Sequence, residues 1–168
     1  MKIKNIITFA IIALIVFGGV FVFSQNSNDD AKTLTQSASL LSAFEKDFDF
    51  GPISMKNGNV SKVFELKNEG VEPIAISKVY TSCMCTVAKI TDAKGVVSGP
   101  FGMPGHGGGI SKADLEVAPG ETIKVEAIFN PAAHGPSGVG LANRTIFIET
   151  NSSQTPKVEL NFTATVTN

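Results

Sequence analysis

From Phe44 to Val166 the chain repeats one pattern, in which short segments of alternating apolar and polar residues are separated by Gly, Pro and Asn. Successive side chains of a strand point to opposite faces, so such a segment buries one face and exposes the other. Helical periodicity is nearly absent. The pattern predicts an all-β fold, an immunoglobulin-like antiparallel β-sandwich of about seven strands. The clearest inward faces are Ile123, Val125, Ala127 and Phe129 in one segment and Val158, Leu160, Phe162, Ala164 and Val166 in the last.

The first strands of the sandwich are expected between Phe44 and Lys67. Alternation places Phe44, Phe48 and Phe50 on one face of a strand that ends near Gly51. Asn57-Gly58 follows, and this dipeptide is the strongest short signal for a two-residue hairpin turn. We therefore expect a hairpin that joins this strand to the next one.

The N-terminus begins with Lys2 and Lys4, followed by an apolar run from Ile6 to Phe23. Eighteen helical residues span roughly 27 Å, just enough for the hydrocarbon core of a bilayer. Residues 1–23 are therefore interpreted as a transmembrane helix that anchors a single-pass protein in the cell membrane. The lysines predict that the body faces away from the cytoplasm. The alternative is a cleaved signal segment, which would leave a secreted or periplasmic protein.

Composition separates the rest of the chain into a stalk and a body. Residues 24–43 are rich in Ser, Asn, Gln, Thr and Asp, which bury little apolar area, and we expect a flexible stalk there. Residues 44–168 form the predicted sandwich. Acidic and basic residues, 15 and 14 in number, are scattered without clusters, so the chain offers no phosphate-tracking patch and nucleic acid is not an expected partner.

Two connections are unusually rich in glycine. The segment Asp92 to Ala118 contains repeated Gly and Pro, which predicts an insertion without regular structure, and it is too long for a passive turn. The segment Asn130 to Gly140 is shorter and similar in composition. Loops of the first length usually have a function or are disordered.

Cys83 and Cys85 are the only cysteines, and they end an apolar run that resembles a strand. In a flat strand their Cα atoms would lie roughly 6.6 Å apart, near the roughly 6.8 Å limit for a disulfide. Three states are open: a disulfide formed by bending the backbone, two thiols, or two ligands of one soft metal ion. An extracytoplasmic location permits the disulfide.

Additional soft ligands lie in the glycine-rich connections. Met103 and His106 share the longer one, and His134 lies in the shorter one. Thiolate and thioether ligands favour Cu(I), and imidazole suits copper and zinc. One hypothesis is therefore a copper site made of Cys83, Cys85, Met103 and His106, with the long connection folded back over the cysteines. Met103 or His106 should then lie within about 5 Å of a cysteine sulfur, about twice a metal–ligand bond length.

Several stretches together resemble a bacterial family, the domain of unknown function 1573. They are Phe48 to Ile53, Val63 to Gly70, Thr81 to Thr86, Pro119 to Glu121 and Thr150-Asn151. The resemblance covers about residues 44–166 and implies an extracytoplasmic sandwich similar to major sperm protein and Hydin-type domains, without an agreed activity. The family usually has Gly where this chain has Met84, and it lacks so long a glycine-rich insertion.

The sequence favours a non-enzymatic function. No Ser, His and Asp are paired at a recognisable spacing for nucleophilic catalysis, and Gly105 to Gly109 lacks the strand, helix and lysine of a phosphate-binding loop. We expect a membrane-anchored module that binds or scaffolds another protein and holds no cofactor. The alternative is a copper-binding or thiol-redox protein centred on Cys83 and Cys85.

Overall fold

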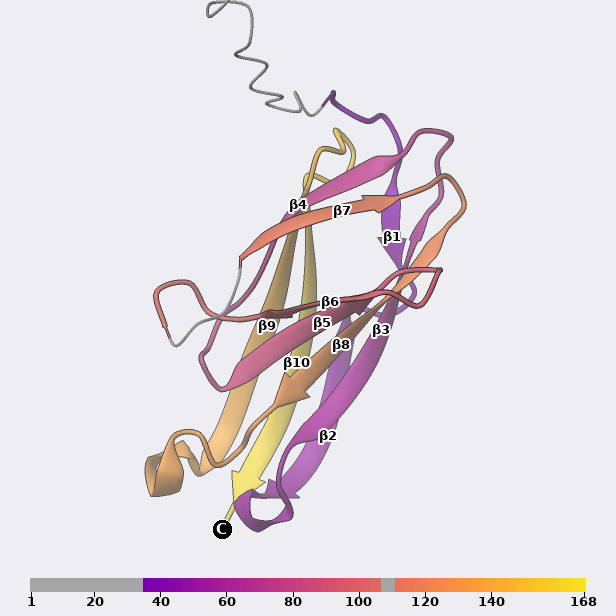
Figure 1. Cartoon of the computed structure of the whole chain (residues 1–168). Coiled ribbons are helices and arrows are strands. Elements are labelled where there is room, and N and C mark those ends of the chain that lie inside the picture. Colours follow the sequence, from indigo (N-terminus) through magenta and orange to yellow (C-terminus); the bar gives the residue numbers. More distant parts are fainter. Residues whose placement is uncertain (1–34, 107–110) are drawn as a thin grey trace, which may run out of the picture. The chain divides into compact units, whose positions relative to one another are not determined.

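A computed structural model describes residues 35–106 and 111–168, drawn in colour in Figure 1. The expected anchor or signal segment (1–23) and most of the expected stalk lie outside the described residues. Within the described ranges no helix is long and apolar enough to cross a membrane. Membrane attachment and the side of the membrane on which the body lies therefore stay predictions.

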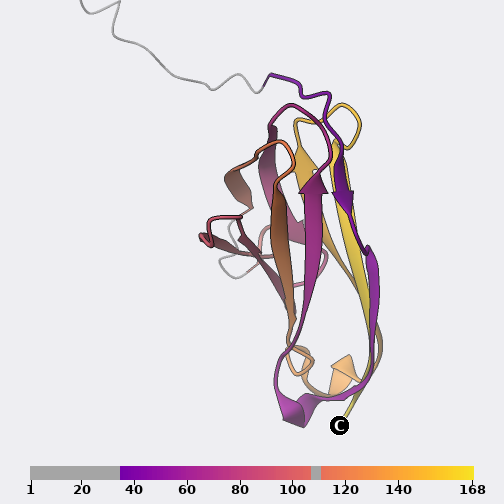
Figure 2. The same ribbon diagram turned by 90° about the vertical axis from the view of Figure 1, so that its right-hand side faces the viewer.

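The described body contains ten strands in two five-stranded sheets, which Figure 2 shows as two layers. The first sheet has the order β1-β3-β8-β5-β6. Its strands are β1 (Leu41–Ala43), β3 (Val60–Asn68), β8 (Thr122–Phe129), β5 (Thr86–Thr91) and β6 (Val97–Phe101). The second sheet has the order β2-β10-β9-β4-β7. Its strands are β2 (Asp47–Ser54), β10 (Lys157–Thr167), β9 (Gly140–Thr150), β4 (Ile74–Thr81) and β7 (Lys112–Val117).

Alternation places one face of each central strand between the sheets. The inward residues expected on β8 and β10 are all buried, which confirms the period of two for these strands. Phe129 of the first sheet and Phe162 of the second meet across the core, with ring centroids 5.5 Å apart. Phe50 packs edge-on against Phe162 at 5.4 Å. The all-β sandwich predicted from the sequence is therefore present.

Two details of the predicted architecture are wrong. The described residues form ten strands rather than about seven, and β2 pairs with β10 in parallel, whereas the other pairings are antiparallel. The parallel pair joins the second strand of the chain to the last one. A pairing between such distant segments leaves no local sequence signal, because it depends on the topology of the whole sheet.

The hairpin expected at Asn57-Gly58 is also wrong. These residues follow β2 in a short 3-10 turn, η1 (Met55–Asn57), but β2 and β3 belong to opposite sheets and do not pair. Gly58 has φ of 80°, which explains the glycine without a hairpin. Phe44 precedes β2 and is 69% exposed, whereas Phe48 and Phe50 pack against the core, so only two of the three expected residues face inward.

The long connection (92–118) contains regular structure that the sequence analysis did not expect. β6 adds to β5 at one edge of the first sheet, and β7 adds to β4 at one edge of the second. Phe101 of β6 and Val117 of β7 are buried, at 2% and 1% exposure. Proline is tolerated in edge strands, where one row of backbone groups is unpaired, and Pro100 lies in β6.

The end of the expected stalk is folded onto the sandwich. Ser37 forms a β-bridge with Ser152, and the Ser152 hydroxyl donates a hydrogen bond to the Ser39 carbonyl at 2.5 Å. The Ser39 hydroxyl donates to the Glu72 carbonyl at 2.8 Å. All three serines are buried, at 2–3% exposure. Residues 37–43 are thus an ordered strap rather than a flexible stalk, because their hydroxyl groups find partners in two loops of the body.

Candidate functional site at the cysteine turn

The cysteines lie in the turn that carries the chain from β4 in the second sheet to β5 in the first. β4 ends at Thr81 and β5 begins at Thr86, so the pair follows the strand rather than belonging to it. The turn brings the two Cα atoms to 5.3 Å, closer than a flat strand would allow. Of the three states that the sequence leaves open, the structure has the Cys83–Cys85 disulfide.

Buried threonines fix the shape of this turn. The Thr86 amide donates to the Cys83 carbonyl at 3.1 Å, which closes the turn. The Thr81 hydroxyl lies 3.0 Å from both the Cys83 and the Thr86 carbonyls, so one donor serves the two acceptors. Thr81 and Thr86 are 1% and 0% exposed. The backbone that carries the sulfurs is therefore rigidly defined from inside the sandwich.

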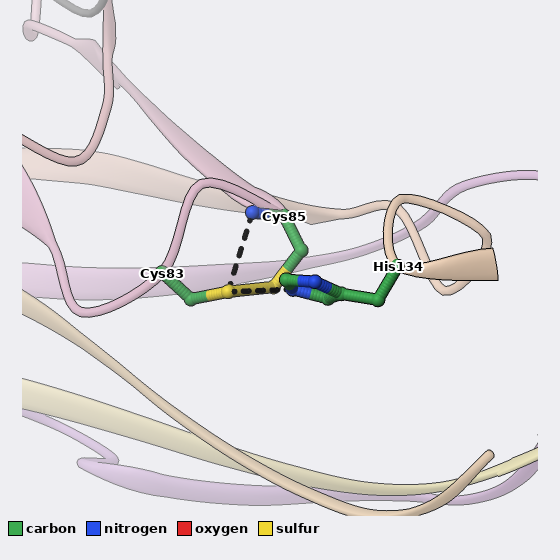
Figure 3. A group of neighbouring side chains, drawn as sticks. All are labelled: Cys83, Cys85 and His134. Atoms are coloured by element: carbon green, nitrogen blue, oxygen red, sulfur yellow. Dashed lines mark hydrogen bonds between the residues drawn. A yellow bond between two sulfur atoms is a disulfide. The ribbon is translucent and has the colours of Figure 1, made fainter. Parts of the chain in front are cut away.

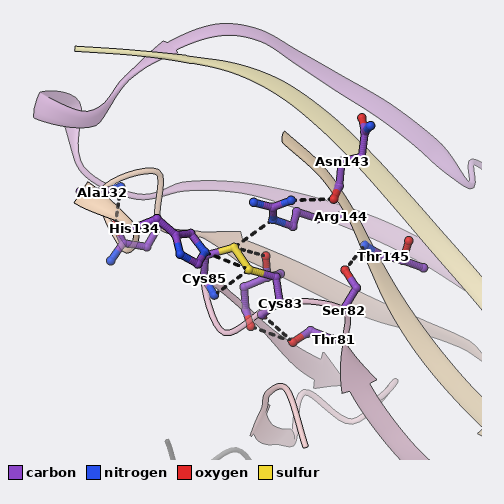
Figure 4. The surroundings of a disulfide bond; sticks show 11 residues. Thr81, Ser82, Cys83, Cys85, Ala132, His134, Asn143, Arg144 and Thr145 are labelled. Carbon is purple, nitrogen blue, oxygen red and sulfur yellow. Dashed lines mark hydrogen bonds between the residues drawn. A yellow bond between two sulfur atoms is a disulfide. The ribbon is translucent and has the colours of Figure 1, made fainter. Parts of the chain in front are cut away.

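The neighbouring strand β9 holds the turn from a second side. The Ser82 amide donates to the Thr145 carbonyl, and the Thr145 amide donates back to the Ser82 hydroxyl, both at 2.9 Å. Figure 4 shows Ser82 and Thr145 beside the disulfide, with the bond to the Ser82 hydroxyl dashed. The next residue toward the start of β9 is Arg144, so the same contact that fixes the turn brings a guanidinium group to it.

The two sulfurs differ in exposure and in partners. Cys85 is 3% exposed, and its Sγ accepts a hydrogen bond from Arg144 Nε at 2.9 Å. Cys83 is half-buried, and its Sγ lies 3.4 Å from the Cys85 amide nitrogen and 3.2 Å from His134 Nε2 (Figure 3). Each sulfur thus has a polar partner of its own, one guanidinium and one imidazole.

Arg144 is held in place by the sandwich as well as by Cys85. Its Nη1 donates to the Asn143 carbonyl at 2.8 Å, and its guanidinium carbon lies 5.7 Å from the centre of the Phe129 ring. Partial burial lowers the pKa of Arg144 from its ordinary value. An arginine side chain remains protonated in proteins at neutral pH, so the guanidinium places a positive charge beside the buried sulfur.

The short connection (130–140) brings His134 to the pair. The Asn130 amide donates to the Cys85 carbonyl at 2.8 Å, which ties the start of the connection directly to the cysteine turn. The Asn130 side chain accepts the Ala132 amide at 2.9 Å. His134 then precedes a short 3-10 turn, η2 (Gly135–Gly138), and the Ser137 hydroxyl donates to the His134 carbonyl at 2.7 Å. The imidazole is exposed but its backbone is well held.

Cys83, Cys85 and His134 form the cluster of ligand side chains that could hold a metal ion in the described part of the chain. Their ligand atoms all lie within 4.8 Å of one another. His106 is exposed in the long connection and does not belong to this group. Met103 is half-buried after β6. Both sulfurs were expected from the sequence, but the histidine beside them is His134. The copper hypothesis with Met103 and His106 stays a prediction.

Two residues of the candidate site, His134 and Arg144, were not assigned to it from the sequence. Strand pairing places Phe129 opposite Thr86, so Asn130 lies beside Cys85 and its connection carries His134 to the sulfurs. Had the register of β5 against β8 been known, it would have placed His134 near the cysteine sulfurs. Arg144 reaches the site from β9, which pairs with β4 over Thr81 to Ile76, and no spacing in the sequence marks it.

Residues 41–99 match the model of a family described as "Protein of unknown function (DUF1573)". This match confirms the resemblance noted in the sequence and includes the cysteine turn. No curated protein matches the chain.

One solved structure supports the fold, and two others are reported beside it. A protein of unknown function from Porphyromonas gingivalis W83 matches with a TM-score of 0.56 and 16% identity, over 81% of this chain and 51% of that one. This chain thus spans about half the length of that protein. A PapD-like domain of human CEP192 matches with a TM-score of 0.47 and 15% identity, over 86% and 97% of the two chains. The periplasmic chaperone SfaE matches with a TM-score of 0.41 and 6% identity, over 77% and 59%. At 16% identity, the match to the Porphyromonas gingivalis protein indicates a shared fold alone.

Proposed function

We propose that this chain, whose residues 41–99 belong to the DUF1573 family, is an extracytoplasmic β-sandwich that exchanges its Cys83–Cys85 disulfide with the thiols of a partner protein. One observation carries the proposal: a cationic donor, Arg144 Nε, lies 2.9 Å from the buried Cys85 sulfur. A guanidinium hydrogen bond is stronger to a thiolate than to a neutral sulfur. The site therefore stabilises the charge that appears when the disulfide opens.

The disulfide contributes little to the stability of the sandwich. It closes a ring that contains a single intervening residue, Met84. Loop-closure entropy for so short a segment gives only about 1.5 kcal/mol, compared with about 3 kcal/mol for a loop of 15 residues. The buried core includes Cys85, but most of it is made of aliphatic and aromatic side chains of both sheets, so it does not rest on this bond alone. The pair can therefore open without unfolding the protein, as a reversible site requires.

Differences in exposure define the order of the exchange. A partner thiolate attacks Cys83 Sγ, since Cys83 is half-buried whereas Cys85 is almost fully covered. A mixed disulfide forms between the partner and Cys83, the bond between the two sulfurs breaks, and Cys85 leaves as a thiolate with the electron pair, stabilised by Arg144.

A second thiol of the partner completes the reaction. It attacks the partner's own sulfur in the mixed disulfide, and Cys83 leaves as a thiolate beside the Cys85 amide and His134. The partner is oxidised to a disulfide, its two electrons pass to the cysteine pair, and its two thiol protons pass to solvent. An oxidising compartment outside the cytoplasm would supply the disulfide form again. The scaffolding role expected from the sequence stays a prediction, and thiol exchange also needs a partner protein.

The redox equilibrium of the full chain against a glutathione buffer tests the proposal. Arg144→Gln should shift the equilibrium toward the disulfide by about three- to tenfold, because a charged hydrogen bond to the thiolate is replaced by a weaker neutral one. Lys157→Gln is the matched control, since it removes a cation that lies over the Phe147 ring on the outer face of the second sheet. The control should leave the equilibrium unchanged.

The direction of attack is tested by single variants. With Cys85→Ser, the remaining Cys83 should react rapidly with a mixed disulfide reagent, whereas with Cys83→Ser the buried Cys85 should react at least about tenfold more slowly. The proposal is wrong if the wild-type pair stays oxidised in the folded protein against excess dithiothreitol.

A further inference from the structure

We infer that the reduced Cys83–Cys85 pair and His134 together form a three-ligand site for one Cu(I) ion. The inference rests on one step of the proposed function, the opening of the disulfide in the folded protein. It goes beyond that function because the site would then hold a metal ion rather than only exchange electrons.

The positions of the three ligand atoms fit a single small ion. Ligands of a trigonal ion with bonds of roughly 2.3 Å lie about 4 Å from one another. The three atoms here lie within 4.8 Å of each other, and His134 Nε2 is 3.2 Å from Cys83 Sγ. Reduction frees the two sulfurs to separate by rotation of their side chains, with the Cα atoms 5.3 Å apart. Only small movements are therefore needed to place an ion among them.

The chemistry of the set favours Cu(I) over other common ions. Two thiolates and an imidazole are soft or intermediate ligands, which suit Cu(I) and zinc rather than calcium or magnesium. Two thiolates and one Cu(I) leave a net charge of −1, and the neighbouring Arg144 guanidinium neutralises it. With Zn(II) the same group would carry a surplus positive charge around the buried Cys85.

The number of available ligands also favours Cu(I) over zinc. Structural zinc sites are almost always closed by four protein ligands. Within the described residues the cluster supplies three, and Arg144 lies against Cys85 without offering an acceptor atom. Cu(I) is stable with two or three ligands, so the set is complete for this ion.

The backbone that carries the three ligands is held in position before any ion binds. Thr81 and Thr86 define the turn that carries the sulfurs, and the Asn130 amide ties the His134 connection to the Cys85 carbonyl. Little conformational entropy therefore remains to be lost when the ion binds.

Titration of the full chain with Cu(I) in mild detergent tests the inference. The chain is first reduced with a phosphine, its two thiols are counted, and Cu(I) is then added without oxygen in competition with a chromogenic chelator. We expect one Cu(I) per chain. His134→Ala should weaken binding at least about tenfold. Loss of a residue that only orients a metal ligand already costs about tenfold or more in affinity, and His134 would be a ligand itself. His106→Ala is the matched control and should change the affinity by less than about twofold.

X-ray absorption at the copper edge gives an independent readout, and we expect two sulfur atoms and one nitrogen around the ion. Equal affinity of the wild type and His134→Ala, a shell of two sulfurs alone, or tighter binding of Zn(II) than of Cu(I) would overturn the inference, while the proposed thiol exchange would stand. If the two thiols cannot be generated in the folded chain, the thiol count shows it before copper is added, and both proposals fail.

Discussion

The connection between β5 and β8 and the connection between β8 and β9 are both rich in glycine, and each carries one histidine. The long connection (92–118) adds an edge strand to each sheet, and its His106 is exposed and apart from the sulfur cluster. The short connection (130–140) adds no strand, yet a backbone hydrogen bond from Asn130 ties it to Cys85 and its His134 reaches Cys83. The imidazole of His134 is thus brought to the cysteine pair by hydrogen bonds of its own connection.

The largest effect on the free energy of unfolding should come from a substitution in the long connection. Phe101→Ala should destabilise the protein by about 3–5 kcal/mol, as expected for a fully buried phenylalanine. Val97→Ala, on the same strand but 59% exposed, is the control and should change the free energy of unfolding by less than about 0.5 kcal/mol. Denaturant unfolding measures both. A cost below about 1 kcal/mol for Phe101→Ala would mean that the long connection is a passive loop after all.

The cysteine turn should tolerate loss of its disulfide. Changing both Cys83 and Cys85 to Ser should cost about 1.5 kcal/mol and leave the sandwich folded, because the bond closes so small a ring. Thermal unfolding followed by circular dichroism measures the change. A double variant that is unfolded at room temperature would show that the disulfide is required for folding. The pair could then not open reversibly in the folded protein.

A smaller effect is expected where the short connection begins. Asn130→Ala removes the acceptor for the Ala132 amide and should cost about 1 kcal/mol. It should also weaken Cu(I) binding, because the backbone that carries His134 loses part of its support. Asn143→Ala, at an exposed asparagine of β9, is the control for both measurements. Unchanged Cu(I) binding in the Asn130 variant would show that the connection is positioned by other contacts.

The smallest effect is expected at His106. Its replacement by Ala should change the free energy of unfolding by less than about 0.5 kcal/mol, as is usual for an exposed residue. Any loss of Cu(I) binding in this variant would support the hypothesis that the long connection supplies a ligand.

The sequence predicted those parts of the fold that depend on near neighbours. The inward faces of β8 and β10 follow from a period of two within a single strand, and they are confirmed. Asn57-Gly58 failed as a hairpin signal because the sheet that receives the next strand is decided by distant residues. β6 was missed because an edge strand buries few of its residues, here Phe101 at its end, and so shows little alternation.

The candidate site, like the fold, was predictable only where it depends on residues close together in the sequence. Cys83 and Cys85 are separated by one residue and were recognised from their spacing alone. His134 and Arg144 reach the sulfurs through the pairing of β5 with β8 and the contact between Ser82 and Thr145. Both contacts join residues that are far apart in sequence, so only the folded chain brings the imidazole and the guanidinium together.

The parallel pairing of β2 with β10 has a mechanical consequence. The indigo start of the described body and the C-terminus lie at opposite ends of the body, and both strands run toward the C-terminal end (Figure 1). A pulling force applied between the start of β2 and the C-terminus acts along these strands and in opposite directions on them. Their hydrogen bonds are then loaded in shear and must break together, whereas bonds at the end of a hairpin would peel apart one by one. The sandwich is built to bear tension along its long axis.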